Sequence, residues 1–154
     1  MKSYKKNSPL ILYPNDGEIS FTRDDIAELK AMALANPEKK IRFCTHDDPN
    51  DLVHEMIIVH TREYKVIPHK HTNRNESIYI IEGEVDILLF GDNGKIQEVI
   101  EMGDLSTSKI FYYKMPRDKV HTFLILSEIL VFKEVTQGPF NYDETIFFKD
   151  YNII

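Results

Sequence analysis

Residues 68–76 read PHKHTNRNE, and this stretch decides the fold. Successive side chains of a strand alternate between its faces, so His69 and His71 point one way and Lys70 points the other. Two imidazoles on one face can chelate a single ion, and the following loop is long enough to return the Glu76 carboxylate over that face. Mixed nitrogen and oxygen ligands favour Zn²⁺, Fe²⁺, Ni²⁺ or Mn²⁺. The stretch therefore predicts a divalent metal site beside a strand.

From residue 41 onward, short apolar stretches alternate with turn residues. Nine of them are predicted to be strands: 42–45, 54–61, 64–68, 77–81, 84–90, 95–100, 110–114, 121–126 and 129–135. The sequence GDNG at 91–94 predicts a hairpin turn, because Asp, Asn and Gly tolerate positive φ. This spacing of short strands predicts an all-β sandwich or barrel over residues 41–154, including a C-terminal tail.

Residues 1–40 form an N-terminal extension with one predicted helix. Thr22 is the predicted N-cap, and two aspartates occupy the first turn, where the helix dipole favours carboxylates. Apolar residues follow at helical spacing until the Asn-Pro pair at 36–37. The apolar stretch 10–13 predicts an edge or exchanged strand. We expect the extension and helix to pack on the barrel, which gives a single structural domain.

The composition is that of an ordinary soluble globular protein, with 42% hydrophobic and 29% charged residues. The net charge of −6 and the scattered basic residues argue against nucleic-acid binding. No apolar stretch approaches the roughly 20 residues of a transmembrane helix, and no signal-peptide core follows the N-terminus. A single cysteine, Cys44, excludes an intrachain disulfide. We expect a cytoplasmic protein.

The stretch that begins at Pro68, followed by Gly83, resembles the first motif of the cupin superfamily. Gly103-Asp104, then Pro116 and His121, resembles the second motif. The resemblance implies a cupin fold, which is a double-stranded β-helix or jelly-roll barrel, and it adds His121 to the metal site. The implied ligands of one divalent ion are His69, His71, Glu76 and His121.

A narrower resemblance, to the WbuC-type cupin family, extends over roughly residues 20–142. The residues that carry it are RFCTH at 42–46, HEM at 54–56, ES at 76–77, IIEG at 80–83, FYY at 111–113, HT at 121–122 and TQGPF at 136–140. It implies a cupin-fold metalloprotein of the kind often encoded among polysaccharide and O-antigen genes. The chain departs from the general cupin pattern at Ile125, where an Asn often follows the second-motif histidine.

The strand expected at 54–61 places His54 on the same face as His60. If that face looks into the barrel, His54 can reach the pocket as an acid, a base or a substrate ligand. Glu55 is a second candidate for proton transfer. The alternative is that His54 only caps its strand by a hydrogen bond to the backbone.

Arg42, Cys44 and His46 share one parity and are expected to line one wall. Arg42 is the natural anion-binding candidate, because a guanidinium grips carboxylate or phosphate with two hydrogen bonds. The alternative for Arg42 is a structural salt bridge. His46 is a second candidate for substrate binding, whereas a cysteine in this setting is more often a small buried apolar residue.

Tyr112 and Tyr113 must point to opposite faces of their strand, so at most one reaches the metal cavity. We assign Tyr113 to proton transfer and Tyr112 to substrate binding as candidates. The alternative is that both simply pack or face solvent.

These residues and resemblances predict a metal-dependent protein that acts on or binds a small carbohydrate or nucleotide-sugar in surface polysaccharide biosynthesis. An enzyme of this kind would be a sugar isomerase or epimerase, in which the cation polarises a carbonyl or hydroxyl pair. Two alternatives stay open, namely a non-catalytic binding module and an Fe(II)-dependent dioxygenase. We expect a homodimer formed through sheet edges, with the stretch 10–13 as a candidate edge.

Overall fold

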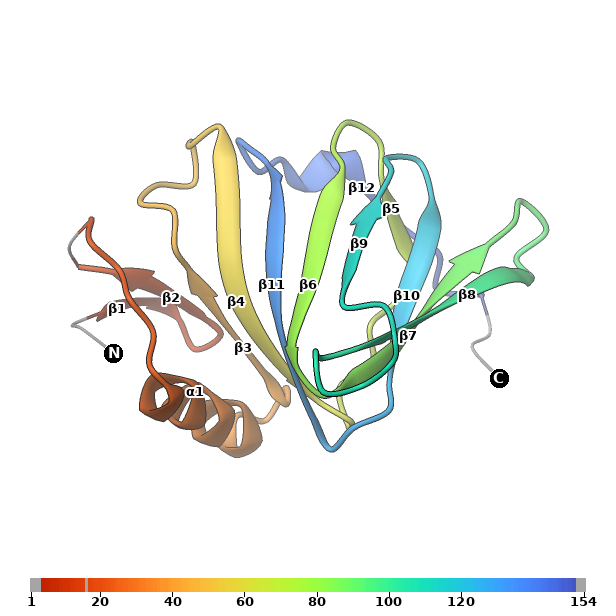
Figure 1. The fold of residues 1–154 in the computed structure, drawn as a ribbon. Coiled ribbons are helices and arrows are strands. Elements are labelled where there is room, and N and C mark those ends of the chain that lie inside the picture. The colour runs from red at the N-terminus through yellow and green to blue at the C-terminus, as the bar shows by residue number, and fades with distance from the viewer. Residues whose placement is uncertain (1–3, 16, 152–154) are drawn as a thin grey trace.

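Two β-sheets face each other in the computed structural model, which describes residues 4–15 and 17–151 (Figure 1). The seven-stranded sheet contains, in spatial order, β1 (Tyr4–Ser8), β2 (Ile11–Pro14), β3 (Lys40–Cys44), β4 (Val53–Thr61), β11 (Ile129–Gln137), β6 (Glu76–Glu82) and β9 (Tyr112–Met115). The five-stranded sheet contains β12 (Thr145–Phe147), β5 (His69–His71), β10 (Val120–Ile125), β7 (Glu84–Phe90) and β8 (Ile96–Gly103). A short 3-10 helix, η1 (Tyr142–Glu144), precedes β12. The prediction of an all-β fold with one N-terminal α-helix is confirmed for the described residues.

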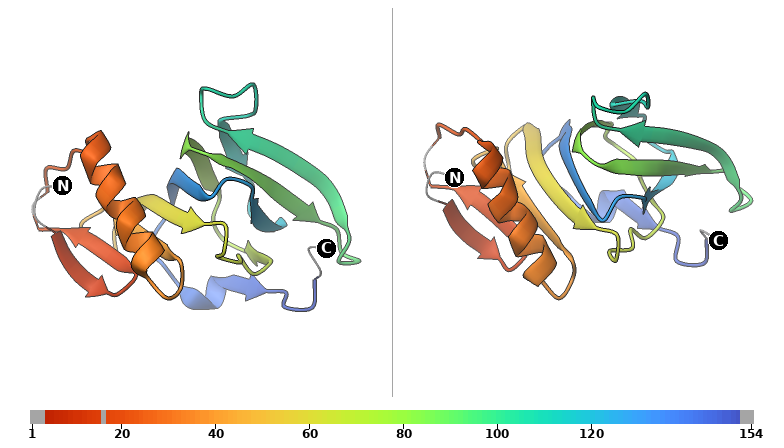
Figure 2. Two further views of the ribbon diagram at one scale, coloured as in Figure 1. Left: turned by 90° about the horizontal axis from the view of Figure 1, so that it is seen from below. Right: turned by 60° about the horizontal axis from the view of Figure 1, so that its bottom comes forward.

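The helix α1 (Arg23–Ala35) lies across the outer face of the larger sheet, over β3 and β4 (Figure 2). Thr22 is its N-cap as predicted, and a capping box forms because the Asp25 side chain accepts from the Thr22 backbone at 2.6 Å. The helix ends at Asn36, since the following proline disfavours helical backbone in the residue before it. Leu29 and Ala33 bury its inner face against the sheet.

Strict alternation along the central strands decides what faces the barrel and what faces the helix. On β3, Ile41 and Phe43 pack under α1, whereas Arg42 and Cys44 line the barrel cavity. The same alternation on β4 and β11 directs every second side chain into the barrel, and these inward side chains are both apolar and polar. The apolar part of the barrel core includes Met56, Ile58, Leu130 and Phe132, together with Ile78 and Ile80 of β6.

The turn between β6 and β7 requires glycine at position 83. Gly83 has φ of +96°, and a Cβ atom there would lie 2.4 Å from Ser127 Oγ and 2.6 Å from the Ile129 carbonyl oxygen. Its backbone N–H donates to Asp104 Oδ2 at 2.9 Å. The glycine of the first motif and the aspartate of the second are therefore in contact, which joins the two halves of the barrel.

Two details of the predicted strand pattern are wrong. Residues 64–68 are not a strand, because Pro68 has no N–H to donate and the ladder begins after it, at β5. The stretch 10–13 is not an edge, since β2 pairs with β1 on one side and runs parallel to β3 on the other. The polar sequence YKKNS of β1 gave no strand signal.

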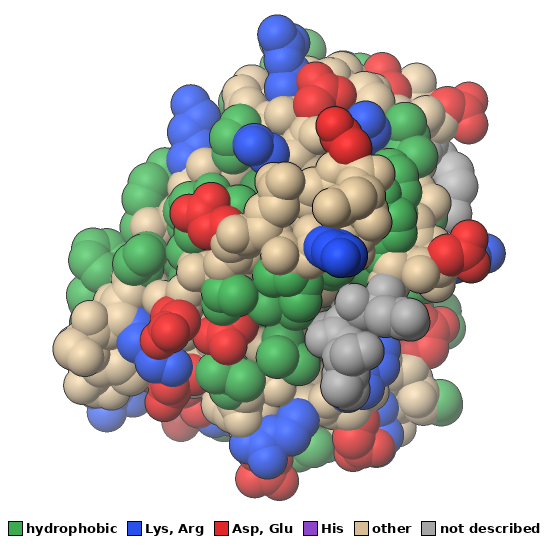
Figure 3. Space-filling view, turned by 90° about the vertical axis from the view of Figure 1, so that its right-hand side faces the viewer, with side chains coloured by type: hydrophobic (Ala, Val, Ile, Leu, Met, Phe, Trp, Pro, Cys, Tyr) green, Lys and Arg blue, Asp and Glu red, His purple; other side chains and the backbone are tan. Residues whose placement is uncertain are grey.

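The described residues contain no helix that is both long enough and apolar enough to cross a membrane. On the face shown in Figure 3, Lys and Arg side chains are interspersed with Asp and Glu and form no continuous basic patch.

Candidate metal centre

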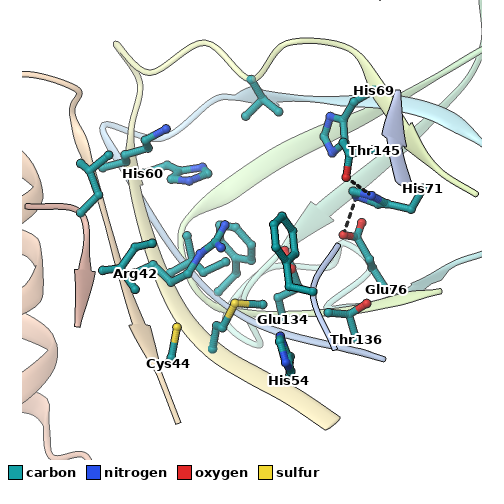
Figure 4. A pocket seen from close by; sticks show the side chains of 18 of the residues that line it. Arg42, Cys44, His54, His60, His69, His71, Glu76, Glu134, Thr136 and Thr145 are labelled. Carbon is teal, nitrogen blue, oxygen red and sulfur yellow. Dashed lines mark hydrogen bonds and ion pairs between the residues drawn. The ribbon is translucent and has the colours of Figure 1, made fainter. Parts of the chain in front are cut away.

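A cavity of about 600 Å³ lies inside the barrel, and both sheets contribute to its walls. This volume falls within the range of small-molecule sites, which is about 300–1,000 Å³. The cavity is mostly apolar, but polar side chains gather at two places in it (Figure 4). One group contains the predicted metal ligands on β5, β6 and β10, and the other lies on β3 and β4.

Three histidines converge on one point of the cavity wall. His69 and His71 come from the same face of β5, and His121 of β10 is paired directly opposite His69. One ring nitrogen of each lies within 4.8 Å of the others, so one ion can contact all three. The two-residue spacing and the register between β5 and β10 together produce this cluster.

Backbone carbonyls orient two of these rings. His69 Nδ1 lies 2.8 Å from the Ile67 carbonyl oxygen, and His121 Nδ1 lies 3.0 Å from that of Lys119. A carbonyl only accepts hydrogen bonds, so each Nδ1 carries a proton and each Nε2 is directed into the cavity. This is the arrangement by which proteins prepare histidines for a metal ion. Burial, together with the His121 charge, lowers the pKa of His69 to about 4 and keeps its ring neutral.

Glu76 at the start of β6 supplies a carboxylate to the same cluster. Its two oxygens lie 2.9 Å from His71 Nε2 and 3.4 Å from His121 Nε2. Burial opposes the charged form of Glu76, but hydrogen bonds from His121 and His71 outweigh it and hold the pKa well below its usual range. The Glu76 side chain therefore keeps its negative charge among the imidazoles, although the residue is only 6% exposed.

Two residues that the sequence interpretation did not identify contact His71 Nδ1, on the side of the ring opposite the metal-binding nitrogen. Its Nδ1 lies 3.0 Å from Thr145 Oγ1 of β12 and 2.9 Å from Nη2 of Arg74, which also donates to Thr145 Oγ1 at 3.2 Å. A guanidinium only donates, whereas a hydroxyl can accept twice. Without a bound cation, His71 Nε2–H therefore donates to the Glu76 carboxylate while Nδ1 accepts from Arg74. A bound cation would take the place of the Nε2 proton, and Nδ1–H would then donate to Thr145.

The donor set therefore fits a divalent cation. Three imidazoles and one carboxylate are the mixed ligands of borderline metals such as Zn²⁺ and Fe²⁺. A cation would displace the proton that Glu76 favours on His121, since burial lowers the pKa of His121 but the Glu76 carboxylate raises it above its usual value. The residues that would hold it are His69, His71, Glu76 and His121. Their low exposure and their fixed outer partners leave the open side of the cluster facing the cavity.

The second polar group contains the candidates from β3 and β4. Arg42, His46 and His54 all line the cavity, together with Cys44. The rings of His46 and His54 are stacked, with centroids 4.0 Å apart. His54 Nε2 lies 3.1 Å from the Pro49 carbonyl oxygen, and His46 Nδ1 lies 3.1 Å from that of Glu55. His54 thus makes the backbone contact considered for it and also borders the cavity, while burial and the neighbouring His46 lower its pKa.

Three sequence candidates lie outside the cavity. Glu55 points to the other face of β4 and pairs with Lys133 at 3.2 Å. Tyr112 is 49% exposed on β9 and donates to Ser77 Oγ at 3.3 Å. Tyr113 points the opposite way, as alternation requires, but it packs against the apolar core, and burial raises its pKa. None of the three borders the group of metal ligands.

Glu134 of β11 is a cavity residue that the sequence interpretation did not identify. Its side chain forms no hydrogen bond or ion pair within the described chain. Burial and the negative charge of Glu76 raise its pKa to about 7, although Arg42 and Arg74 oppose the rise. Strand alternation could have identified Glu134, because it lies on the same face of its strand as Phe132 and Thr136, and Phe132 is a core residue.

A family model matches residues 21–102, more than half of the 154 residues, and its description is "Domain of unknown function (DUF6016)". The chain belongs to the DUF6016 family. The DUF6016 match includes His69, His71 and Glu76 and ends before His121. A comparison with curated proteins finds no match.

Solved structures give the fold of this DUF6016 chain. Protein SO0799 from Shewanella oneidensis has a TM-score of 0.57 at 13% identity, over 73% of this chain and 76% of that one. The capsular polysaccharide assembling protein CapF from Staphylococcus aureus has 0.54 at 17% identity, over 71% of this chain. The matched part is only 31% of CapF, so this chain spans about a third of its length. The fold is that of the cupins, as the sequence motifs predicted.

Proposed function

We propose that this chain binds one divalent cation through His69, His71, Glu76 and His121 and uses it to bind or transform a small carbohydrate or nucleotide-sugar. The observation that carries the proposal is the convergence of three histidines within 4.8 Å, with Glu76 between two of them, on the wall of a cavity. A cation held there would act as a Lewis acid toward a carbonyl or hydroxyl oxygen of the ligand.

Groups of the chain itself supply the remaining functions of such a site. Glu134 faces the cavity, forms no hydrogen bond or ion pair with the residues that the structure describes, and can accept or return a proton. The walls include apolar side chains such as Met56 and Phe132, against which the apolar parts of a ligand can pack. The polysaccharide context comes from the WbuC-type resemblance of the sequence. CapF, which shares the fold, is itself a capsular polysaccharide assembling protein.

Elemental analysis of protein purified without a metal-affinity tag tests the metal site. We expect about one divalent ion per chain, and loss of most of it in His71→Ala and His121→Ala. His60→Leu is the matched control, since His60 also lines the cavity but lies outside the cluster. Equal metal content in the wild type and His121→Ala would refute the site.

Turnover is tested by incubating protein loaded with Zn²⁺, Fe²⁺, Ni²⁺ or Mn²⁺ with nucleotide-sugars and analysing the products by mass spectrometry. A product that requires the metal and disappears in Glu134→Gln supports an enzyme. Tight binding without product under every metal supports the binding module instead. Product that forms only with Fe²⁺ and O₂ supports the dioxygenase.

A further inference from the structure

Arg42 carries a positive charge into the cavity, and none of the described residues pairs with it. Its side chain lines the cavity from β3, on the side away from the metal ligands (Figure 4). Within the described chain it donates no hydrogen bond and has no carboxylate within 4.0 Å. The salt bridge considered from the sequence is therefore not formed among these residues. A guanidinium has five N–H donors, so cavity water or a ligand must accept them.

Three titratable groups that line the cavity lie close enough to Arg42 for its charge to act on their pKa values. After burial, Arg42 is the largest cause that lowers the pKa of His60, and it opposes the rise that burial causes in the pKa of Cys44. It also opposes the raised pKa of Glu134. Arg42 and Glu134 both line the cavity from the larger sheet, on strands separated by β4, and do not pair with each other.

The charge balance of the cavity favours an anion. Three cationic side chains line it, Lys40, Arg42 and Arg74, against the two carboxylates Glu76 and Glu134. Lys40 forms an ion pair with Glu38 at 3.3 Å and donates a hydrogen bond to Tyr64. Arg74 donates hydrogen bonds to the ring of His71 and to Thr145. A divalent cation at Glu76 would make the cavity more positive still. Arg42 is then the cation available to a ligand.

We propose that Arg42 is the subsite for an oxyanion, a carboxylate or a phosphate, carried by a small sugar whose oxygens reach the metal centre at the other side of the cavity. The inference rests on the proposed function, because it requires the metal centre to hold the far end of the ligand. It narrows the substrate class from carbohydrates in general to anionic ones. Glu134, between the two ends, would accept hydrogen bonds from the sugar hydroxyls.

Three sugars that share one ring separate the contribution of the anionic group to binding from that of the ring. They are glucose, which is neutral, glucuronate, which carries a carboxylate, and glucose 1-phosphate. Their binding to metal-loaded protein is measured by calorimetry, after the metal content of each sample is established. We expect at least one of the two anions to bind about tenfold or more tightly than glucose, the effect of one charge-assisted contact. The sugar that binds more tightly than glucose shows whether the subsite prefers a carboxylate or a phosphate.

Arg42→Gln should remove this preference while metal content and glucose binding stay unchanged. Arg117→Gln is the matched control, because Arg117 is exposed and lies outside the cavity, and it should keep the preference. Arg42→Gln should also unfold at the same or a higher denaturant concentration than the wild type, since no internal partner is lost. Equal or undetectable binding of all three sugars by metal-loaded wild type, or a preference that survives in Arg42→Gln, overturns the inference. A wild type that holds no metal defeats the proposed function instead, and this inference falls with it.

Discussion

Replacing His60 by leucine should make the folded protein less sensitive to acid. His60 is on β4 and lines the cavity, and its Nδ1 is buried without a hydrogen-bond partner in the described chain. Burial lowers its pKa to about 3, and the nearby charges of Arg42 and Lys40 act in the same direction. The ring also packs against Tyr64, with centroids 4.5 Å apart. No acidic group acts on its pKa to compensate.

The magnitude follows from the difference between the folded and unfolded pKa of this group. In the unfolded chain a histidine has a pKa of about 6.5, so it takes up a proton between pH 7.5 and pH 5, whereas folded His60 does not. The unfolded state binds more protons over this range, so the free energy of unfolding falls as the pH falls. The contribution of His60 to this loss is about 2 kcal/mol at pH 5. It is absent well above pH 6.5 and reaches its full size only below pH 3.

Urea unfolding followed by circular dichroism at pH 7.5 and pH 5 measures this contribution. Chelator is present throughout, so the metal ligands titrate alike in both proteins. The wild type should lose about 2 kcal/mol more than His60→Leu between the two pH values. The comparison is of pH slopes, so any change in packing caused by leucine cancels. An equal loss in the two proteins would show that the folded ring takes up the proton normally and would refute the reasoning.

Three further predictions concern the supports of the site. Thr145→Val should weaken metal binding about 10- to 100-fold in a competition titration, because it removes the hydroxyl behind a ligand ring, whereas Thr72→Val should leave affinity unchanged. Gly138→Ala should lower the free energy of unfolding by about 1–3 kcal/mol or more, since its Cβ would lie 2.0 Å from a carbonyl oxygen and 2.5 Å from an imidazole. Gly17→Ala, whose nearest contact would be 3.9 Å, should be nearly neutral in the same urea assay. Leu12→Ala should cost about 2–5 kcal/mol, because this side chain is fully buried under the helix; a cost below 1 kcal/mol would contradict the packing described.

Period-two alternation made much of the fold and part of the cavity predictable from the sequence. It is a local property of each strand, so it requires no knowledge of which strands pair. It placed Arg42, Cys44 and His46 on one wall and His54 with His60 on another, and the structure puts all five at the cavity. The roles assigned to them stay predictions.

Pairing between distant segments could not be read in the same way. β12 lies more than 70 residues after β5, yet Thr145 is paired with His71 and contacts its ring. The sequence TIF at 145–147 favours a strand, but nothing local to it shows that its partner is β5. Arg74 was equally hidden, since a charged residue in a turn normally faces solvent, whereas this one is 4% exposed beneath Phe140.

The polar residues of the cavity differ in whether the protein itself satisfies them, and this difference separates their functions. At the metal centre every ring has an outer partner, which fixes its direction, as a rigid ion site requires. Arg42 and Glu134 have no such partners among the described residues, and Glu134 interrupts a strand whose inward residues include the apolar Leu130 and Phe132. Leaving charged groups unpaired in a largely apolar cavity costs stability, so a sequence selected for stability alone would hold apolar residues there. The presence of Arg42 and Glu134 is explained if a ligand pairs with their charged groups. A higher stability of Arg42→Gln without ligand would then measure the stability that the unpaired charge of Arg42 costs.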